Sequence, residues 1–247
     1  PVCIYLSEEL KKRALHPVIL SRGYKGATIG PSIVSFFDSA TDVGDEPKLM
    51  SKLGHTVIVA KDRVKGAKFI EQRDLGDVII LDDGFQHRRL GRDFDIACFD
   101  VASDKAVKDV IKGQLLPCGK LRENLRRGIK RAGAIIFSLG SDPKAGEERA
   151  HRVTQFLNVS ALPFYYEIKF LGVFNALSSE LLPPGRIVAF SALAKPQNFL
   201  DSLKNLNFNV VKSYSFSDHY EFSIAEMTKI FKEANYPIVC TEKDAVK

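Results

Sequence analysis

Two adjacent carboxylates, Asp82 and Asp83, lie where they could bind a metal ion that carries a phosphate. They follow the apolar run 78–81, which has the composition of a buried parallel strand, and they precede a glycine. In open α/β sheets, ligands gather at the carboxyl ends of the strands. Because Mg²⁺ takes oxygen ligands and shares them with phosphates, an acid pair in this position indicates phosphoryl transfer. The alternative is that the two aspartates cap a helix or form a turn.

A second pair of acids, Asp45 and Glu46, stands directly before Pro47. Proline suits the first position of a helix and an acid before it suits a cap, so capping alone could explain Asp45 or Glu46. His219 follows an expected strand far along the chain. A histidine can orient a carboxylate or receive its proton, although loop histidines are otherwise commonly surface or capping groups.

Arginines follow several apolar segments or lie in Gly/Pro turns, as Arg22, Arg63 and Arg122 do. A planar guanidinium in such a place could bind a phosphate through two hydrogen bonds. The alternative for each of them is an ordinary solvated arginine.

The elements that must position these side chains alternate between strand and helix. In the first part of the chain we expect helices at 2–13 and ending near 73, a basic helix after Pro117, and strands at 17–20, 57–60, 78–81, 96–100 and 134–137. After turn residues at 140–143 and a charged helix, we expect strands at 165–170, 186–191 and 209–214 and helices at 197–206 and 224–233. This recurrence predicts βαβ units in a parallel sheet with helices on both faces.

Composition limits the class of protein. A chain of 247 residues with 45% hydrophobic residues suits one large or two small α/β domains. The apolar runs are strand-sized, far below the ~20 residues that span a bilayer, and no signal peptide is visible. The four cysteines are widely spaced without a C-x-x-C pair, and three of them (Cys3, Cys98, Cys240) lie in apolar stretches, which indicates reduced core thiols.

The net charge of +6 and a pI near 9.1 favour an anionic partner. Basic residues concentrate at Arg88, Arg89 and Arg92 and again at Lys120, Arg122, Arg126, Arg127, Lys130 and Arg131. Near an anionic membrane each could contribute on the order of 1 kcal/mol of attraction. The alternative is a solvated helix face, and no nucleic-acid motif accompanies the arginines.

Five blocks stand in one order along most of the chain, and each is a weak signal alone. They are Ser21-Arg-Gly-Tyr24, Gly44-Asp-Glu-Pro47, Leu81-Asp-Asp-Gly-Phe-Gln-His-Arg-Arg-Leu90, Leu116-Pro-Cys-Gly-Lys-Leu-Arg-Glu123 and Phe216-Ser-Asp-His-Tyr220. Together they closely resemble the tetraacyldisaccharide 4'-kinase family of lipid A biosynthesis.

The resemblance implies a P-loop-NTPase-like parallel α/β sheet with helices on both faces, plus a second, smaller α/β lobe. Residues 1–140 would form the kinase core lobe, 141–164 a linker region and 165–247 the second lobe, with the active site in the cleft between the lobes. It assigns catalysis to Asp45 and His219, and metal binding to Asp82, Asp83 and Glu46. Substrate and phosphate binding would fall on Arg22, Tyr24, Arg63, Gln86, His87, Arg122 and Glu123.

The activity implied is transfer of the γ-phosphoryl group of ATP, with Mg²⁺, to the 4'-hydroxyl of tetraacyldisaccharide 1-phosphate. The lipid substrate implies a peripheral protein that acts on an anionic membrane, at the cytoplasmic face of the bacterial inner membrane. Two alternatives stay open: a P-loop phosphotransferase acting on a soluble acceptor, and a non-catalytic module that binds nucleotide or membrane.

The phosphate-binding loop of the family, Gly-x-x-x-x-Gly-Lys-Thr followed directly by proline, is absent from this chain, which opens at Pro1. We expect that the chain was cut just after that loop and that it also lacks the C-terminal end. On this expectation residues 1–247 alone are inactive or nearly so.

Overall fold

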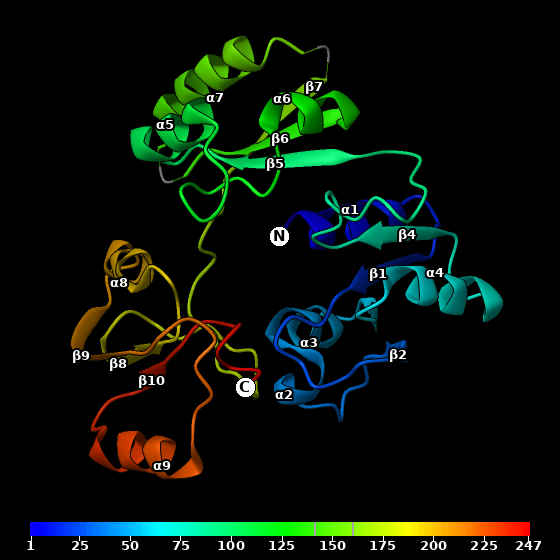
Figure 1. The fold of residues 1–247 in the computed structure, drawn as a ribbon. Helices are drawn as coiled ribbons and strands as arrows, with labels where there is room; N and C mark the ends of the chain where they lie inside the picture. The colour runs from blue at the N-terminus through cyan, green and yellow to red at the C-terminus, as the bar shows by residue number, and fades with distance from the viewer. Residues whose placement is uncertain (141, 160) are drawn as a thin grey trace. The chain divides into compact units, whose positions relative to one another are not determined.

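The computed structural model describes residues 1–140, 142–159 and 161–247. Ser141 and Ser160, both within the expected linker 141–164, lie outside the described residues. The described chain divides into two compact units, one formed by Pro1–Asp82 with Phe170–Lys247 and the other by Asp83–Lys169. Figure 1 follows the chain through both. These boundaries, at residues 82 and 169, differ from the predicted lobes 1–140 and 165–247, which a linker at 141–164 joins.

The first sheet of unit 1 has the strand order β2-β3-β1-β4. Its members are β1 (Pro17–Ser21), β2 (Ser32–Ile33), β3 (Thr56–Val59) and β4 (Val78–Leu81). β1 pairs with β3 and β4 in parallel, whereas β2 is antiparallel at the edge. Every residue of β1 is buried, because helices cover both faces of the sheet.

Alternate β1 side chains divide between two apolar clusters. Ile19 packs with Met50 and Val43 beside α1 (Val2–Lys11), α2 (Ala40–Val43) and α3 (Asp45–Lys52). Val18 and Leu20 point the other way and pack with Ile70 of α4 (Arg63–Gln72). This arrangement confirms the predicted parallel sheet with helices on both faces.

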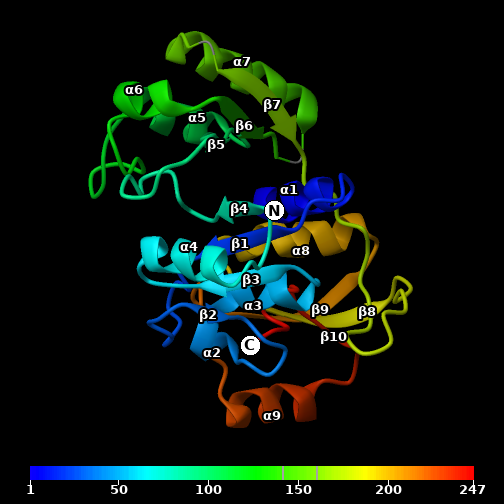
Figure 2. The ribbon, with the colours of Figure 1, turned by 90° about the vertical axis from the view of Figure 1, so that its right-hand side faces the viewer.

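The second sheet of unit 1 is parallel, with the order β10-β8-β9. It consists of β8 (Arg186–Ser191), β9 (Asn209–Ser215) and β10 (Ile238–Val239). Ile187 and Ala189 pack against Phe199 and Leu203 of α8 (Pro196–Asn205). Figures 1 and 2 show α9 (Ile224–Glu233) on the opposite side of this sheet from α8.

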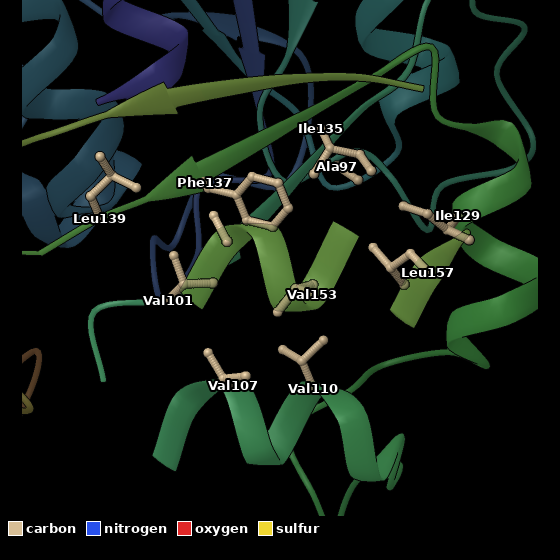
Figure 3. Packing of buried hydrophobic residues seen from close by; sticks show 11 residues of the cluster. Ala97, Val101, Val107, Val110, Ile129, Ile135, Phe137, Leu139, Val153 and Leu157 are labelled. Atoms are coloured by element: carbon tan, nitrogen blue, oxygen red, sulfur yellow. The ribbon is translucent and has the colours of Figure 1, made fainter. Parts of the chain in front are cut away.

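Unit 2 contains a parallel sheet with the order β5-β6-β7. Its strands are β5 (Ile96–Asp100), β6 (Ala134–Ser138) and β7 (Leu162–Tyr166), and its helices are α5 (Asp104–Lys112), α6 (Leu125–Gly128), the short 3₁₀ turn η1 (Ile129–Arg131) and α7 (Pro143–Leu157). Phe137 of β6 lies at the centre of the core, against side chains of α5 and α7 such as Val107 and Val153 (Figure 3).

Three details of unit 2 differ from the sequence predictions. The strand expected at 165–170 is instead Leu162–Tyr166, and it ends where its pairing with Ser138, the last residue of β6, ends. The expected basic helix after Pro117 is confined to α6 and η1, since Asn124 caps α6 at the Arg127 amide. Cys98 is exposed instead of buried, because it alternates with Ala97, whose side chain faces the core.

The predicted α/β class is therefore confirmed, with short, mainly parallel sheets between helices. Among the helices of the described chain, none combines the length and the apolar character needed to cross a membrane.

Candidate functional site

Asp45 and His219 form a hydrogen-bonded pair in unit 1. His219 Nδ1 and Asp45 Oδ2 are 2.9 Å apart although 174 positions separate the residues in the chain. Both side chains are largely buried, with exposed fractions of 13% for Asp45 and 17% for His219. A carboxylate hydrogen-bonded to an imidazole is one arrangement that can serve general acid–base catalysis.

The turn before α3 presents the Asp45 side chain to His219. Gly44 precedes the helix with φ +94°, and a Cβ there would lie 2.8 Å from the Tyr24 carbonyl oxygen, so only glycine suits the turn. Among the described residues, no side chain makes a capping hydrogen bond at the start of α3. The capping explanation of Asp45 and Glu46 is therefore wrong, and the Asp45 carboxylate is directed to His219 instead.

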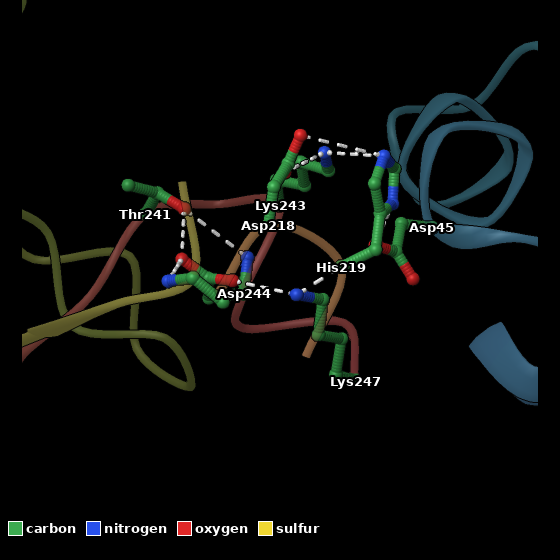
Figure 4. Close-up of polar contacts among 8 residues, drawn as sticks. Asp45, Asp218, His219, Thr241, Lys243, Asp244 and Lys247 are labelled. Atoms are coloured by element: carbon green, nitrogen blue, oxygen red, sulfur yellow. Dashed lines mark hydrogen bonds and ion pairs between the residues drawn. The ribbon is translucent and has the colours of Figure 1, made fainter. Parts of the chain in front are cut away.

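His219 lies between an aromatic ring and a lysine. The Tyr24 ring meets the His219 ring edge-on, with 5.5 Å between centroids. Lys243 Nζ is 3.4 Å from His219 Nε2 and 3.3 Å from an Asp218 carboxylate oxygen. Burial raises the pKa of Asp218, but the Lys243 charge and hydrogen bond outweigh burial and lower the pKa overall. Figure 4 shows this network beside the start of α3.

A second lysine, Lys247, lies between two carboxylates. Its Nζ is 2.9 Å from Asp244 Oδ1 and 3.6 Å from Asp45 Oδ2, and only 5% of its side chain is exposed. Asp244 is itself fully buried and accepts hydrogen bonds from the Ala192 amide and the Thr241 hydroxyl. The pair from α3 and the loop after β9 is thus surrounded by groups from the segment after β10.

Asp82 lies at the carboxyl end of β4, at the edge of the first sheet where its parallel strands end. Leu20 and Leu81 are paired across β1 and β4, so the next residues, Ser21 and Asp82, are neighbours at the strand ends. The Ser21 hydroxyl donates to Asp82 Oδ2 at 3.0 Å, and the Cys3 thiol contacts Oδ1 at 3.5 Å. The buried Arg63 donates to the Asp82 carbonyl at 3.3 Å.

The oxygens of Asp82 and Ser21 are of the type that binds Mg²⁺. Mg²⁺ usually binds proteins through one or two carboxylates, keeps waters and takes the remaining oxygens from phosphates, and Asp82 with Ser21 offers oxygens of that kind. Over the ranges that the structure covers, no group of three or more His, Cys, Asp or Glu side chains is gathered for a metal ion. Glu46 is exposed on α3.

Asp83 is the first residue of unit 2 and is held there by Arg122. Arg122 Nη1 lies 2.6 Å from both carboxylate oxygens of Asp83, and this hydrogen bond raises the pKa of Arg122. The side chains are 61% and 57% exposed. A guanidinium in this position neutralises Asp83 but can also exchange partners, since the pair is open to solvent.

A second cluster in unit 2 joins Gln86, Glu123 and Arg131. Glu123 accepts from Arg131 at 2.8 and 3.0 Å and from Gln86 at 3.2 Å, and the Arg131 hydrogen bond is the main reason that the pKa of Glu123 is lowered. His87 is half-buried nearby in the chain, with its carbonyl accepting from Arg92. Arg22 is exposed after β1.

The sequence predictions missed Lys243, Asp244 and Lys247. They lie in the segment that follows β10, where the rule that ligands gather at the carboxyl ends of parallel strands could have indicated them. Asp218 was quoted only as part of a motif, and its neighbour His219 was singled out.

Comparisons with known proteins agree on one family. The family described as Tetraacyldisaccharide-1-P 4'-kinase matches residues 1–247. The tetraacyldisaccharide 4'-kinase of Psychromonas ingrahamii is 34% identical over 249 residues, covering 100% of this chain and 70% of the relative. That of Shewanella oneidensis is 32% identical over 248 residues, covering 100% and 68%.

A solved structure is similar over nearly the whole chain. The crystal structure of the "apo" form of LpxK from Aquifex aeolicus in complex with ATP superposes with a TM-score of 0.72 at 32% identity. The match covers 99% of this chain and 73% of that chain. With a family match over its full length, the chain belongs to the tetraacyldisaccharide-1-P 4'-kinase family.

Proposed function

We propose that the protein phosphorylates the 4'-hydroxyl of tetraacyldisaccharide 1-phosphate with ATP as the phosphate donor. Family membership gives the reaction class, and one observation of this chain carries the proposal: the hydrogen bond between Asp45 and His219. The two residues are distant in sequence, but their side chains are largely buried and hydrogen-bonded to each other, as in an acid–base pair.

In the proposed reaction Asp45 accepts the proton of the 4'-hydroxyl. The hydroxyl oxygen forms a bond to the γ-phosphorus, the bond from that phosphorus to the β,γ-bridging oxygen breaks, and ADP leaves. His219 orients the Asp45 carboxylate and stabilises it once it is protonated. Little covalent chemistry is asked of the protein, because phosphoryl transfer depends mainly on positioning and on charge stabilisation.

Mg²⁺ is proposed as the cofactor. When bound, it would neutralise charge on the phosphate oxygens. Asp82, supported by the Ser21 hydroxyl, is the proposed ligand in unit 1. Asp83 and Glu46 are proposed as further acids on the metal side, and Asp83 would have to exchange its contact with Arg122 to serve.

The proposed phosphate-binding and substrate-binding groups belong to both units. Arg63 is fixed beside Asp82, and Tyr24 lies against His219. Arg122, Gln86, His87 and Glu123 lie in unit 2, where solvent-exposed pairs leave the guanidinium able to change partner. Arg22 is free to reach a phosphate from its exposed position after β1.

We further propose that the protein binds peripherally to an anionic membrane, at the cytoplasmic face of the bacterial inner membrane. The support is the lipid named in the family description and the basic residues Arg126, Arg127 and Lys130 of α6 and η1. Each cation near an anionic surface contributes on the order of 1 kcal/mol.

The test uses the purified natural gene product that contains residues 1–247, with ATP, Mg²⁺ and tetraacyldisaccharide 1-phosphate in detergent micelles. We expect mass spectrometry to find a lipid heavier by one phosphoryl group, with the new phosphate on the 4' position, and chelation of Mg²⁺ to abolish its formation. Phosphorylation of soluble alcohols but not of the lipid would support a different phosphotransferase. ATP or vesicle binding without any transfer, unchanged in Asp45→Ala, would indicate a binding module.

A further inference from the structure

Two lysines contact the two members of the Asp45–His219 pair from the segment after β10. Lys247 Nζ is 3.6 Å from Asp45 Oδ2, and Lys243 Nζ is 3.4 Å from His219 Nε2. A lysine ammonium can only donate hydrogen bonds. The atom that each lysine contacts, His219 Nε2 or Asp45 Oδ2, must therefore act as an acceptor.

Both lysines are themselves held by acids. Lys247 is fixed by Asp244, whose carboxylate is tied to the Ala192 amide at 3.1 Å and the Thr241 hydroxyl at 2.8 Å. Lys243 is fixed by Asp218 at 3.3 Å. Only the Lys247–Asp244 pair is buried, and a buried ion pair often adds no stability over apolar residues of similar volume.

The two oxygens of Asp45 are used unequally. Oδ2 receives both the His219 contact at 2.9 Å and the Lys247 ion pair at 3.6 Å. Within residues 1–140, 142–159 and 161–247, Oδ1 accepts no hydrogen bond. Lys247 and His219 thus hold one oxygen and leave the other available to a hydroxyl group.

Lys243 selects the form of the His219 ring. Because its ammonium donates to Nε2, the neutral ring must accept there and carry its hydrogen on Nδ1. That hydrogen is the one that can be donated to Asp45 Oδ2. Without Lys243, the ring could place its hydrogen on Nε2 toward Asp218 and lose the bond to Asp45.

We propose that Lys247 and Lys243 are positioning residues of the phosphoryl-transfer site: Lys247 orients the Asp45 carboxylate so that Oδ1 meets the acceptor hydroxyl, and Lys243 fixes His219 as the Nδ1–H tautomer. The inference rests on the proposed function, since it assigns a purpose to the pair that this function uses.

The test compares three variants of the natural gene product with the wild type. Lys243→Met removes the partner of Nε2 and leaves only the half-exposed Asp218 unpaired. The double variant Lys247→Met with Asp244→Asn removes a buried charge together with its partner, so that no uncompensated charge remains in the core. Lys204→Met, an exposed lysine of α8, is the matched control.

Three readouts are taken for each protein: kcat, KM for the lipid, and the ¹⁵N shifts of the His219 ring at alkaline pH. We expect kcat to fall up to about 100-fold in the double variant, as misplacement of a reacting group causes, with KM unchanged. In Lys243→Met we expect a smaller loss of kcat and a shift of the ring from Nδ1–H toward Nε2–H. The control keeps wild-type values.

The proposal is overturned if the wild type is active and both kcat and the His219 tautomer survive in these variants. Equal losses of kcat and thermal stability, without any change of tautomer in Lys243→Met, would also overturn it, because they would indicate a purely structural role. Failure of the proposed function has a different signature: the wild type itself then transfers no phosphate to the lipid.

Discussion

The Asp45–His219 pair of unit 1 and the Asp83–Arg122 pair of unit 2 differ in how far solvent reaches them. In unit 1 the Asp45 carboxylate is largely buried, bonded to His219 and flanked by lysines that buried or half-buried acids hold. In unit 2 the Asp83–Arg122 pair is more than half exposed, although the apolar core around Phe137 is tightly packed. The proposed function gives each arrangement a purpose: catalysis by Asp45 requires fixed geometry, whereas Arg122 must be free to change partner to bind a phosphate.

The largest effect is expected from Asp45→Asn, which removes the proposed base of unit 1. An amide cannot take the proton of a hydroxyl, so we expect kcat to fall by about 10²- to 10⁴-fold, the range of a general base. The measurement is steady-state phosphorylation of the lipid, with Asp201→Asn on the exposed side of α8 as the control. A variant with more than half of the wild-type kcat would contradict a catalytic role for Asp45.

Phe137→Ala tests what stabilises unit 2. The ring is fully buried where β6 packs against α5 and α7, and its loss should lower the free energy of unfolding by about 3–5 kcal/mol. Urea unfolding followed by hydrogen exchange in β5 and β6 would measure this. Phe156→Ala, at a partly exposed position of α7, should cost much less. Equal costs would mean that the buried cluster is not the core of the unit.

Arg122→Met tests the open ion pair. Exposed pairs contribute about 0–1 kcal/mol, so the melting temperature should barely move, whereas KM for a phosphate-bearing substrate should rise. Arg152→Met breaks another exposed pair of unit 2, with Asp104, and serves as the matched control for stability. If both variants raise KM alike, Arg122 has no special part in binding phosphate.

The smallest expected effect is a pH dependence in unit 1. Burial lowers the pKa of His55 below 6.5, and Lys11 adds to that effect. The unfolded chain then binds more protons between the folded and unfolded pKa values, so the free energy of unfolding falls as the pH drops below about 6.5. Chemical denaturation at several pH values should show this slope, and His55→Gln should flatten it. If the slope is unchanged in His55→Gln, the pH dependence comes from groups other than His55.

The sequence predicts strands and helices well where local pattern decides them. β1, β3 and β4 lie within a residue of their expected positions, because buried parallel strands read as apolar runs. The strand at β7 was displaced, since its extent is set by β6 and not by its own residues. The basic helix was too long in the prediction, because capping by Asn124 decides where α6 begins.

The candidate site was only partly accessible from the sequence. Strand-end position indicated Asp82, and the family motifs indicated Asp45 and His219. The contact between Asp45 and His219 depends on the way unit 1 joins segments from both ends of the chain, which no local pattern encodes. Lys247 was missed because its importance comes from burial between Asp45 and Asp244, and a lysine is ordinarily a surface residue.

The most direct test of the central claim is a double-mutant cycle on kcat with Asp45→Asn, His219→Asn and the double variant. Residues that act as one unit in catalysis lose activity together, so we predict that the double variant is no slower than the slower single variant. If the two losses multiply in the double variant, Asp45 and His219 act independently, and the acid–base pair proposed here does not exist.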